Sequence, residues 1–264
     1  MRADPADRRL SLPGRRERAA MLWRSFSIQA SWNYRTLIGH GYAYALLPVL
    51  RAIYRGDPER FADAVARHAR LFNSHPYLAP MALGAVARME AEGEDPVVVE
   101  RFKTAVRGSL GTIGDRLVWA GWRPVCLLFS LALLMVGATW WLAVISFLVV
   151  YNVGHVGLRL WSYRLGWREG KRVGEQMRRS GIATVQRVLP VVGAFLVGMA
   201  VPLAVAGRHL STASISVGQS LPAFWTVIAI VAAILGARFG ARVRGPVILM
   251  LLGSSFFGLL VRLL

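Results

Sequence analysis

The run from Pro124 to Leu158 constrains this chain most, because its 35 residues include no acidic or basic side chain apart from His155. A helix that crosses a bilayer needs about 20 consecutive apolar residues. The run is therefore long enough for two spans, with a turn predicted near Gly137–Thr139, and one long tilted helix is the alternative. Either arrangement indicates an integral membrane protein.

The composition and charge of the whole chain agree with this reading. The chain is 55% hydrophobic with a mean hydropathy of +0.44, which is too apolar for an ordinary soluble domain. Its net charge is +18, and 19 of its 32 basic residues precede Pro124 while eight lie between Arg159 and Arg187. Basic blocks that alternate with apolar blocks are typical of membrane topology. Because the charge is not gathered on one compact domain, no nucleic-acid partner is expected.

Three regions are expected along the chain. Residues 1–18 are arginine-rich and lack the apolar core of a signal peptide, which predicts a basic cytoplasmic tail. Residues 19–123 form an amphipathic and re-entrant region, and residues 124–264 form a transmembrane helical region. The predicted fold is an all-α integral membrane protein with about five spans, an interfacial amphipathic N-terminal part and re-entrant or broken helices. The expected later elements are a basic cytoplasmic loop at Arg159–Arg187 and spans at Leu189–Ala206, Leu221–Ala237 and Pro246–Leu264.

The segment Ala19–Tyr54 is dense in aromatic residues, with arginines at intervals. This mixture is typical of a helix that lies in the membrane–water interface. Within the segment, Gln29–Tyr34 is a polar island. On the residues alone, we expect Trp32 and Asn33 to make hydrogen bonds at that interface.

Two clusters place helix-breaking and polar residues in apolar surroundings. In the first, Phe72–Pro80, two prolines prevent an uninterrupted helix. The second, Gly108–Asp115, has glycines three residues apart, and a helix is expected before it, from Val97 to Val106. Irregular backbone at membrane depth is tolerated only where it is buried in protein or faces a watery cavity. We therefore interpret both clusters as part of the pathway of a transporter subunit.

Asp115 is the only acidic residue between Glu100 and Glu169. A carboxylate at membrane depth indicates a functional site and needs a counter-charge, for which Arg116 or Arg123 is the expected source. The alternative is a structural salt bridge at the cytoplasmic interface.

Polar signals also mark the ends of surface elements. Asp57–Pro58 and Asp95–Pro96 each predict the start of a helix, because proline suits the first helical turn. The acidic stretch Glu90–Glu100 is interpreted as a solvated cytoplasmic loop. His68 is interpreted as a solvated or capping histidine, since nothing at ligand spacing makes it a metal site.

Four stretches carry motifs that occur in a known order and spacing; they are Gln29–Tyr34 with Gly41 and Pro48, Phe72–Tyr77 with Gly84 and Glu90, Gly108–Trp119 ending in Arg123–Pro124, and Tyr163–Gly170. Together they resemble the IID membrane component of the mannose-type (mannose, fructose, sorbose) sugar phosphotransferase system of bacteria. The resemblance covers about residues 20–180.

The resemblance implies a function and a set of partners. A IID component pairs with a IIC subunit in the bacterial inner membrane to conduct a sugar of the mannose, fructose or sorbose type. Cytoplasmic IIA and IIB domains, phosphorylated on histidine, then transfer phosphate to the sugar. The IID component itself carries no phosphorylated residue, and no catalytic residue, cofactor or metal is expected. The family also suggests a trimer of IIC–IID pairs.

Within that reading, Asn33, Asn73 and His75 are expected to contribute to the sugar pathway, and Asp115 also belongs to it. Trp32 or Tyr77 is expected to cover a sugar face. Amide groups offer both donors and acceptors for sugar hydroxyls. The alternative is that these side chains merely tie broken helices together. The chain also departs from the family pattern, and the departures leave a non-conducting membrane scaffold or sensor as the alternative function; they include Arg35, Ser109, Thr112 and Arg116.

Overall fold

The structure, a computed structural model, describes residues 12–212, with side chains as far as residue 198. The packing of the helices divides the chain into two units: unit 1 comprises Met1–Asp115 and His155–Ser180, and unit 2 comprises Arg116–Gly154 and Gly181–Leu264. Two expected spans, Leu221–Ala237 and Pro246–Leu264, lie outside the described residues, as does most of the N-terminal tail.

Unit 1 is helical, and no β-strand occurs among residues 12–212. Its elements are α1 (Arg15–Arg24), η2 (Ser25–Ser27), α2 (Gly39–Ile53), α3 (Pro58–His68), α4 (Ala79–Ala91), α5 (Pro96–Gly114), the end of α7 (Trp140–Glu169), η4 (Gly170–Arg172) and α8 (Val173–Arg179). The all-α prediction is therefore confirmed.

Two helices of unit 1 begin where the aspartate–proline pairs predict. The carboxylate of Asp57 accepts a hydrogen bond from the Arg60 backbone N–H at 3.1 Å, and α3 follows. The carboxylate of Asp95 accepts from the Val97 backbone N–H at 2.7 Å, and α5 follows. Each aspartate satisfies a backbone donor that has no partner within the first helical turn.

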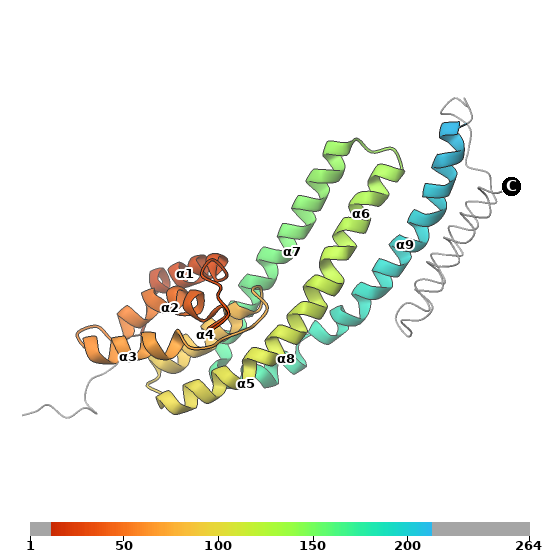
Figure 1. The fold of residues 1–264 in the computed structure, drawn as a ribbon. Coiled ribbons are helices and arrows are strands. Elements are labelled where there is room, and N and C mark those ends of the chain that lie inside the picture. The colour runs from red at the N-terminus through yellow and green to blue at the C-terminus, as the bar shows by residue number, and fades with distance from the viewer. Residues whose placement is uncertain (1–11, 213–264) are drawn as a thin grey trace, which may run out of the picture. The chain divides into compact units, whose positions relative to one another are not determined.

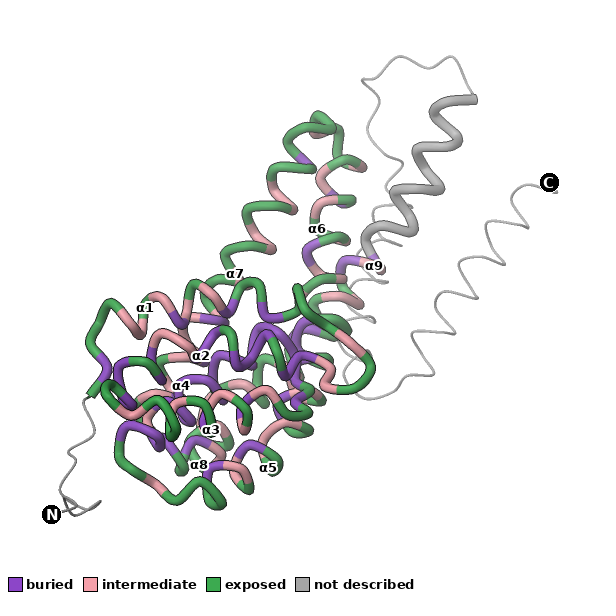
Figure 2. Tube along the Cα trace, turned by 60° about the vertical axis from the view of Figure 1, so that its left-hand side comes forward, coloured by how far each residue is buried: buried purple, intermediate pink, exposed green. Residues whose placement is uncertain are grey.

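Helix α4 is the centre of unit 1. All of its residues except Arg88 are buried, and α2 and α5 pack against it. A helix that is apolar nearly all round must lie inside a core. Figure 2 shows this concentration of buried residues in α2 and α4.

Two glycines allow α4 to cross the end of α7 at close range. A Cβ added to Gly84 would lie 2.7 Å from the Tyr163 carbonyl oxygen, and one added to Gly166 would lie 2.0 Å from the Met81 carbonyl oxygen. Any side chain at these positions would force the two backbones apart. The motif glycines in these two stretches therefore serve helix packing.

The second polar cluster does not interrupt its helix, which corrects the prediction that a helix ends at Val106. Helix α5 continues to Gly114, and a π-helical segment, η3 (Asp115–Trp122), leads into α6 (Arg123–Met135). The cluster contains no proline, so every residue in it can donate its backbone N–H to the helical ladder. Each glycine costs about 1 kcal/mol relative to alanine, which packing can offset.

Unit 2 contains α6, the first part of α7 and α9 (Ile182–Thr212). Helices α6 and α9 lie side by side (Figure 1). Between α6 and α7 the chain turns at Gly137, whose φ of +92° favours glycine. The predicted turn is confirmed and the single tilted helix is wrong. The expected span at Leu189–Ala206 lies within α9.

Two helical stretches in the described part, Pro96–Met135 and Trp140–Arg179, are long and apolar enough to cross a membrane. The interpretation of Arg159–Arg187 as a loop is largely wrong, because α7 continues as far as Glu169 and α8 follows. The first break comes at Gly170, with a φ of +52°. Arginine is a good helix former, so charge alone does not end a helix.

Candidate functional site

The first polar cluster lies in the loop between α3 and α4. Phe72 anchors it, since its side chain is fully buried with its ring centroid 4.3 Å from that of Tyr42 in α2. The Phe72 backbone N–H donates to the Thr36 carbonyl at 3.2 Å, and the Ile38 N–H donates to the Phe72 carbonyl at 3.1 Å. These bonds join the loop that carries Asn73 to the loop that carries Asn33.

The side-chain amide of Asn33 holds its own turn together. Its Oδ1 accepts from the backbone N–H groups of Arg35 and Thr36, at 3.0 and 2.9 Å. Its Nδ2 lies 2.8 Å from Thr36 Oγ1, a further partner within the turn. Such a turn is a common structural use of asparagine. For Asn33, the geometry therefore favours the helix-tying alternative.

Trp32 and Asn73 are both accessible. Trp32 is 47% exposed and meets the Tyr34 ring edge-on, with centroids 4.8 Å apart. Asn73 is exposed, and its amide makes no hydrogen bond to any residue in the described part of the chain. Asn73 can therefore offer both a donor and an acceptor to a ligand or partner.

His75, two residues further on, is buried and shapes the start of α4. Its carbonyl oxygen accepts from the backbone N–H groups of Leu78 and Ala79, at 3.0 and 2.8 Å. Its ring Nδ1 accepts from the Tyr77 N–H at 3.2 Å. Burial, with the positive charges of Arg159 and His155, lowers the pKa of His75 to about 4. The ring is then neutral at pH 7, with its proton on Nε2.

The glycines of the second cluster let this loop lie against α5. A Cβ added to Gly114 would lie 2.2 Å from His75 Cβ, and one added to Gly111 would lie 3.9 Å from Ser74 Cα. The Ser74 hydroxyl is buried and finds no hydrogen-bond partner within residues 12–212. The structure thus brings the two polar clusters together in unit 1.

Asp115 begins the π-helical segment η3 and is exposed. The expected ion pair with Arg116 or Arg123 is wrong for the part of the chain that the structure describes. Arg123 instead lies over the ring of Trp119, at 5.2 Å from its centroid. π-Helical segments within α-helices are frequent at functional sites.

A basic and aromatic cluster around Arg159 was not predicted. Arg159 is buried, and its Nη1 donates to the Ser25 carbonyl at 2.7 Å. Its guanidinium lies 5.4 Å from the centroid of the Tyr77 ring, which stacks on His155 at 3.9 Å. One feature of the sequence could have indicated this cluster: Arg159 is the first charged residue after the apolar run. At that depth, an arginine packed against protein costs less free energy than an arginine that faces lipid.

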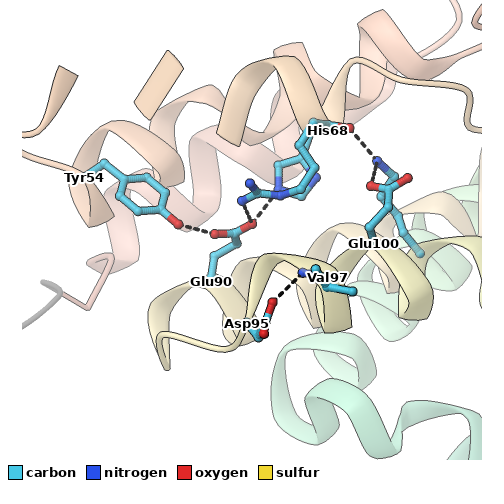
Figure 3. Close-up of polar contacts among 8 residues, drawn as sticks. Tyr54, His68, Glu90, Asp95, Val97 and Glu100 are labelled. Atoms are coloured by element: carbon cyan, nitrogen blue, oxygen red, sulfur yellow. Dashed lines mark hydrogen bonds and ion pairs between the residues drawn. The ribbon is translucent and has the colours of Figure 1, made fainter. Parts of the chain in front are cut away.

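A second unpredicted cluster surrounds Glu90, and the solvated readings of Glu90 and His68 are wrong. Tyr54 Oη donates to Glu90 Oε2, while Arg67 Nη2 and His68 Nε2 lie 2.6 and 2.8 Å from Oε1 (Figure 3). Burial alone would raise the pKa of Glu90, but bonds from His68, Tyr54 and Arg67 lower it to about 2. This buried anion ties together α3, α4 and the end of α2.

Lys103 extends this polar layer into α5. Its side chain is buried, and its Nζ donates to the Arg67 carbonyl at 2.9 Å and to Glu100 Oε2 at 3.0 Å (Figure 3). Buried charges of this kind are retained only with partners. These polar contacts fix the positions of α2, α3, α4 and α5 relative to one another, beside the loop that carries the first cluster.

The chain has apolar helices long enough to span a bilayer, and they continue into a helical unit that is interrupted by the loop between α3 and α4. This architecture is that of an α-helical integral membrane protein. The family model described as the PTS system mannose/fructose/sorbose family IID component matches residues 14–237. The chain belongs to this family, which confirms the resemblance drawn from its motifs.

Several relatives are similar over about two thirds of the chain. The mannose-specific EIID component of Escherichia coli K12 is 25% identical over 180 residues, which cover 66% of this chain and 63% of that protein. The sorbose-specific EIID component of Klebsiella pneumoniae is 26% identical over 187 residues, or 69% of this chain and 67% of that protein. The fructose permease IID component of Bacillus subtilis 168 is 24% identical over 189 residues, or 70% and 68%.

Two solved structures share the fold. A chain in the structure of the mannose transporter ManYZ with microcin E492 is 23% identical, with a TM-score of 0.57, covering 72% of this chain and 70% of that chain. A second membrane protein structure is also 23% identical, with a TM-score of 0.64 and the same coverages. At this identity, the likeness shows the fold alone.

Proposed function

We propose that the chain is the IID subunit of a sugar-conducting complex in the bacterial inner membrane. It pairs with a IIC subunit to translocate a sugar of the mannose, fructose or sorbose type. Cytoplasmic IIA and IIB domains phosphorylate the sugar as it emerges. The complex is a trimer of IIC–IID pairs, and this multi-pass chain keeps its basic N-terminus in the cytoplasm.

The observation that carries this proposal is the junction of the two polar clusters. Asn73 presents an exposed amide that has no hydrogen bond within residues 12–212, two residues before the buried, neutral His75, in a helix break packed against α5 glycines. An uncharged, hydrogen-bonding group suits a neutral sugar, whose hydroxyls need both donors and acceptors. The names of the relatives, which are specific for mannose and sorbose or act as a fructose permease, point to the same substrate class.

A non-conducting scaffold or sensor is the second candidate. Arg35 and Arg116 are both exposed and stand at positions where the chain departs from the family pattern. An arginine beside a sugar pathway would favour an anionic ligand over a neutral one. The two candidates differ in whether sugar crosses the membrane.

The test is purification from the native membrane in mild detergent, with mass spectrometry of the co-purifying proteins. Recovery of a IIC-like protein in equal amount supports the complex, and membrane vesicles that contain both subunits should then accumulate sugar phosphate when IIA and IIB are added. Assembly with IIC but no sugar phosphate would support the scaffold. A folded chain that purifies alone would overturn the transporter reading.

A further inference from the structure

The N-terminal part of unit 1 exposes a set of large aromatic side chains. Trp23 is 77% exposed and Tyr34 is 89% exposed. The aromatic face, as we call this set, consists of Trp23, Phe26, Trp32, Tyr34 and Tyr44. Large aromatic rings are normally buried, so several exposed ones within a short segment indicate a surface that something covers.

The charge around the aromatic face has one sign. No acidic residue occurs between residues 19 and 56, whereas Arg24 and Arg35 lie within this segment, and Arg35 directly follows Tyr34 and is exposed. The guanidinium of Arg24 lies over the ring of Tyr44, 4.7 Å from its centroid, and donates to the Tyr44 carbonyl at 3.4 Å. A surface of aromatic rings and arginines without carboxylates complements a negatively charged layer.

The contacts of the aromatic face with α7 place it at the end of the apolar run. Phe26 meets the ring of His155, with centroids 5.6 Å apart, and the guanidinium of Arg159 lies 4.5 Å from the Phe26 ring centroid. The uncharged run ends at Leu158, and Arg159 is the first charge after it. If the run crosses the bilayer, its end lies at the membrane–water boundary.

Arg159 holds the aromatic face at the end of the apolar run. Besides the Ser25 carbonyl, its Nη1 reaches Ser25 Oγ at 3.1 Å, and its Nε donates to His155 Nε2 at 3.0 Å. The Arg159 side chain therefore holds the Ser25–Ser27 turn against α7 and does not reach lipid. The turn carries Phe26, and Trp23 contacts that ring at a centroid distance of 5.8 Å.

We propose that the aromatic face is a membrane-interface anchor that rests on anionic phospholipid headgroups, with Arg24 and Arg35 contacting phosphate. Tryptophan and tyrosine prefer this layer because their rings are apolar and their N–H and O–H groups are wet. Arginine near an anionic surface adds electrostatic attraction. This inference does not depend on sugar transport, since a scaffold would need the same anchor.

The depth of the aromatic face in the membrane can be measured with spin labels on introduced cysteines. The chain has only one cysteine of its own, Cys126, so a single substitution removes the background labelling. In a Cys126→Ala background, labels are introduced by Trp23→Cys and Tyr34→Cys, and by Glu59→Cys on α3 as a control. The full chain is placed in nanodiscs of phosphatidylcholine and phosphatidylglycerol. We expect the first two labels to be relaxed more by oxygen than by a water-soluble nickel chelate, and the Glu59 label to show the reverse.

Headgroup preference is tested on the lipids that co-purify from the same mixture. Arg24→Gln with Arg35→Gln should lower the ratio of phosphatidylglycerol to phosphatidylcholine several-fold, since one such contact is worth about fivefold in partitioning. Arg60→Gln is the matched control, because Arg60 also lies over a tyrosine, at 5.2 Å from the Tyr54 ring centroid, but outside the aromatic face.

Three results would count against the anchor. Labels at positions 23 and 34 that respond mainly to the nickel chelate would place the face in water. Labels that neither reagent reaches would show that a protein partner covers it. An unchanged lipid ratio in the double arginine variant would remove the headgroup contact.

Discussion

Gly114 of α5 lies directly against His75: a Cβ added to this glycine would be 2.2 Å from His75 Cβ and 2.4 Å from Cγ. The contact joins the two polar clusters through residues that stand 39 positions apart in the sequence. Because His75 also accepts the hydrogen bonds that start α4, a shift at Gly114 would be passed to the loop that carries Asn73.

Gly114→Ala should therefore destabilise the protein by about 1 to 3 kcal/mol, the usual cost of forcing atoms into a packed site. Thermal unfolding in detergent measures this as a lower Tm. Gly108→Ala is the matched control in the same helix, since nothing lies within 4 Å of its added Cβ. Alanine there should raise stability by up to about 1 kcal/mol. Equal effects of the two changes would refute the contact.

Asn73→Ala and Asn33→Ala should fail in different ways. Asn73 makes no bond within the described chain, so its loss should leave membrane levels normal and raise the KM for sugar uptake about fivefold, the worth of one hydrogen bond. Asn33 holds its own turn, so its loss should lower the Tm and the recovery of the IIC partner. Uptake assays and quantitative blots separate the two. Loss of Asn73→Ala from the membrane would assign it a structural role instead.

The neutral ring of His75 predicts a pH dependence of stability. Its pKa of about 4 lies below the ordinary value of 6.5, so the unfolded chain binds a proton between these values that the folded chain does not. Stability from this group is thus complete above pH 6.5 and is lost as the pH falls toward 4. The Tm of the wild type should fall between pH 7 and pH 5 more steeply than that of His75→Gln.

A His75→Gln variant with an unchanged slope would show that the ring is not the titrating group.

Glu90→Gln should be strongly destabilising, because it leaves Arg67, whose side chain is only 12% exposed, and the buried His68 without their carboxylate. Removing one partner of a buried ion pair costs about 3 kcal/mol or more. Glu92→Gln, two residues away, removes the exposed pair with Arg88 and should cost less than about 0.5 kcal/mol. Thermal or denaturant unfolding compares them. Similar losses in both variants would mean that Glu90 is solvated, as the acidic stretch suggested.

Features that follow from local chemistry were predicted from the sequence. The turn at Gly137 and the starts of α3 and α5 depend on neighbouring residues, namely a glycine with positive φ and aspartate–proline pairs. The apolar runs follow from the chemistry of the bilayer. Motif order was enough to identify the family. The number of spans remains a prediction.

Features that depend on distant partners were not predicted. His68 and Glu90 look like surface residues in sequence, and only their meeting with Tyr54 and Arg67 makes their burial tolerable. The glycines of α5 look like helix breakers, yet their lack of side chains serves a loop from elsewhere in the chain. Local propensity carries no information about such contacts.

The sequence by itself determined that this is a helical membrane protein of the IID family, because hydropathy and motif spacing act along the chain. Only the tertiary structure decided that the Asn33 amide is bonded within its own turn, that the Asn73 amide has no hydrogen bond within residues 12–212, and that His75 is neutral. Those properties depend on which groups become neighbours after folding, and on how much water folding removes from them.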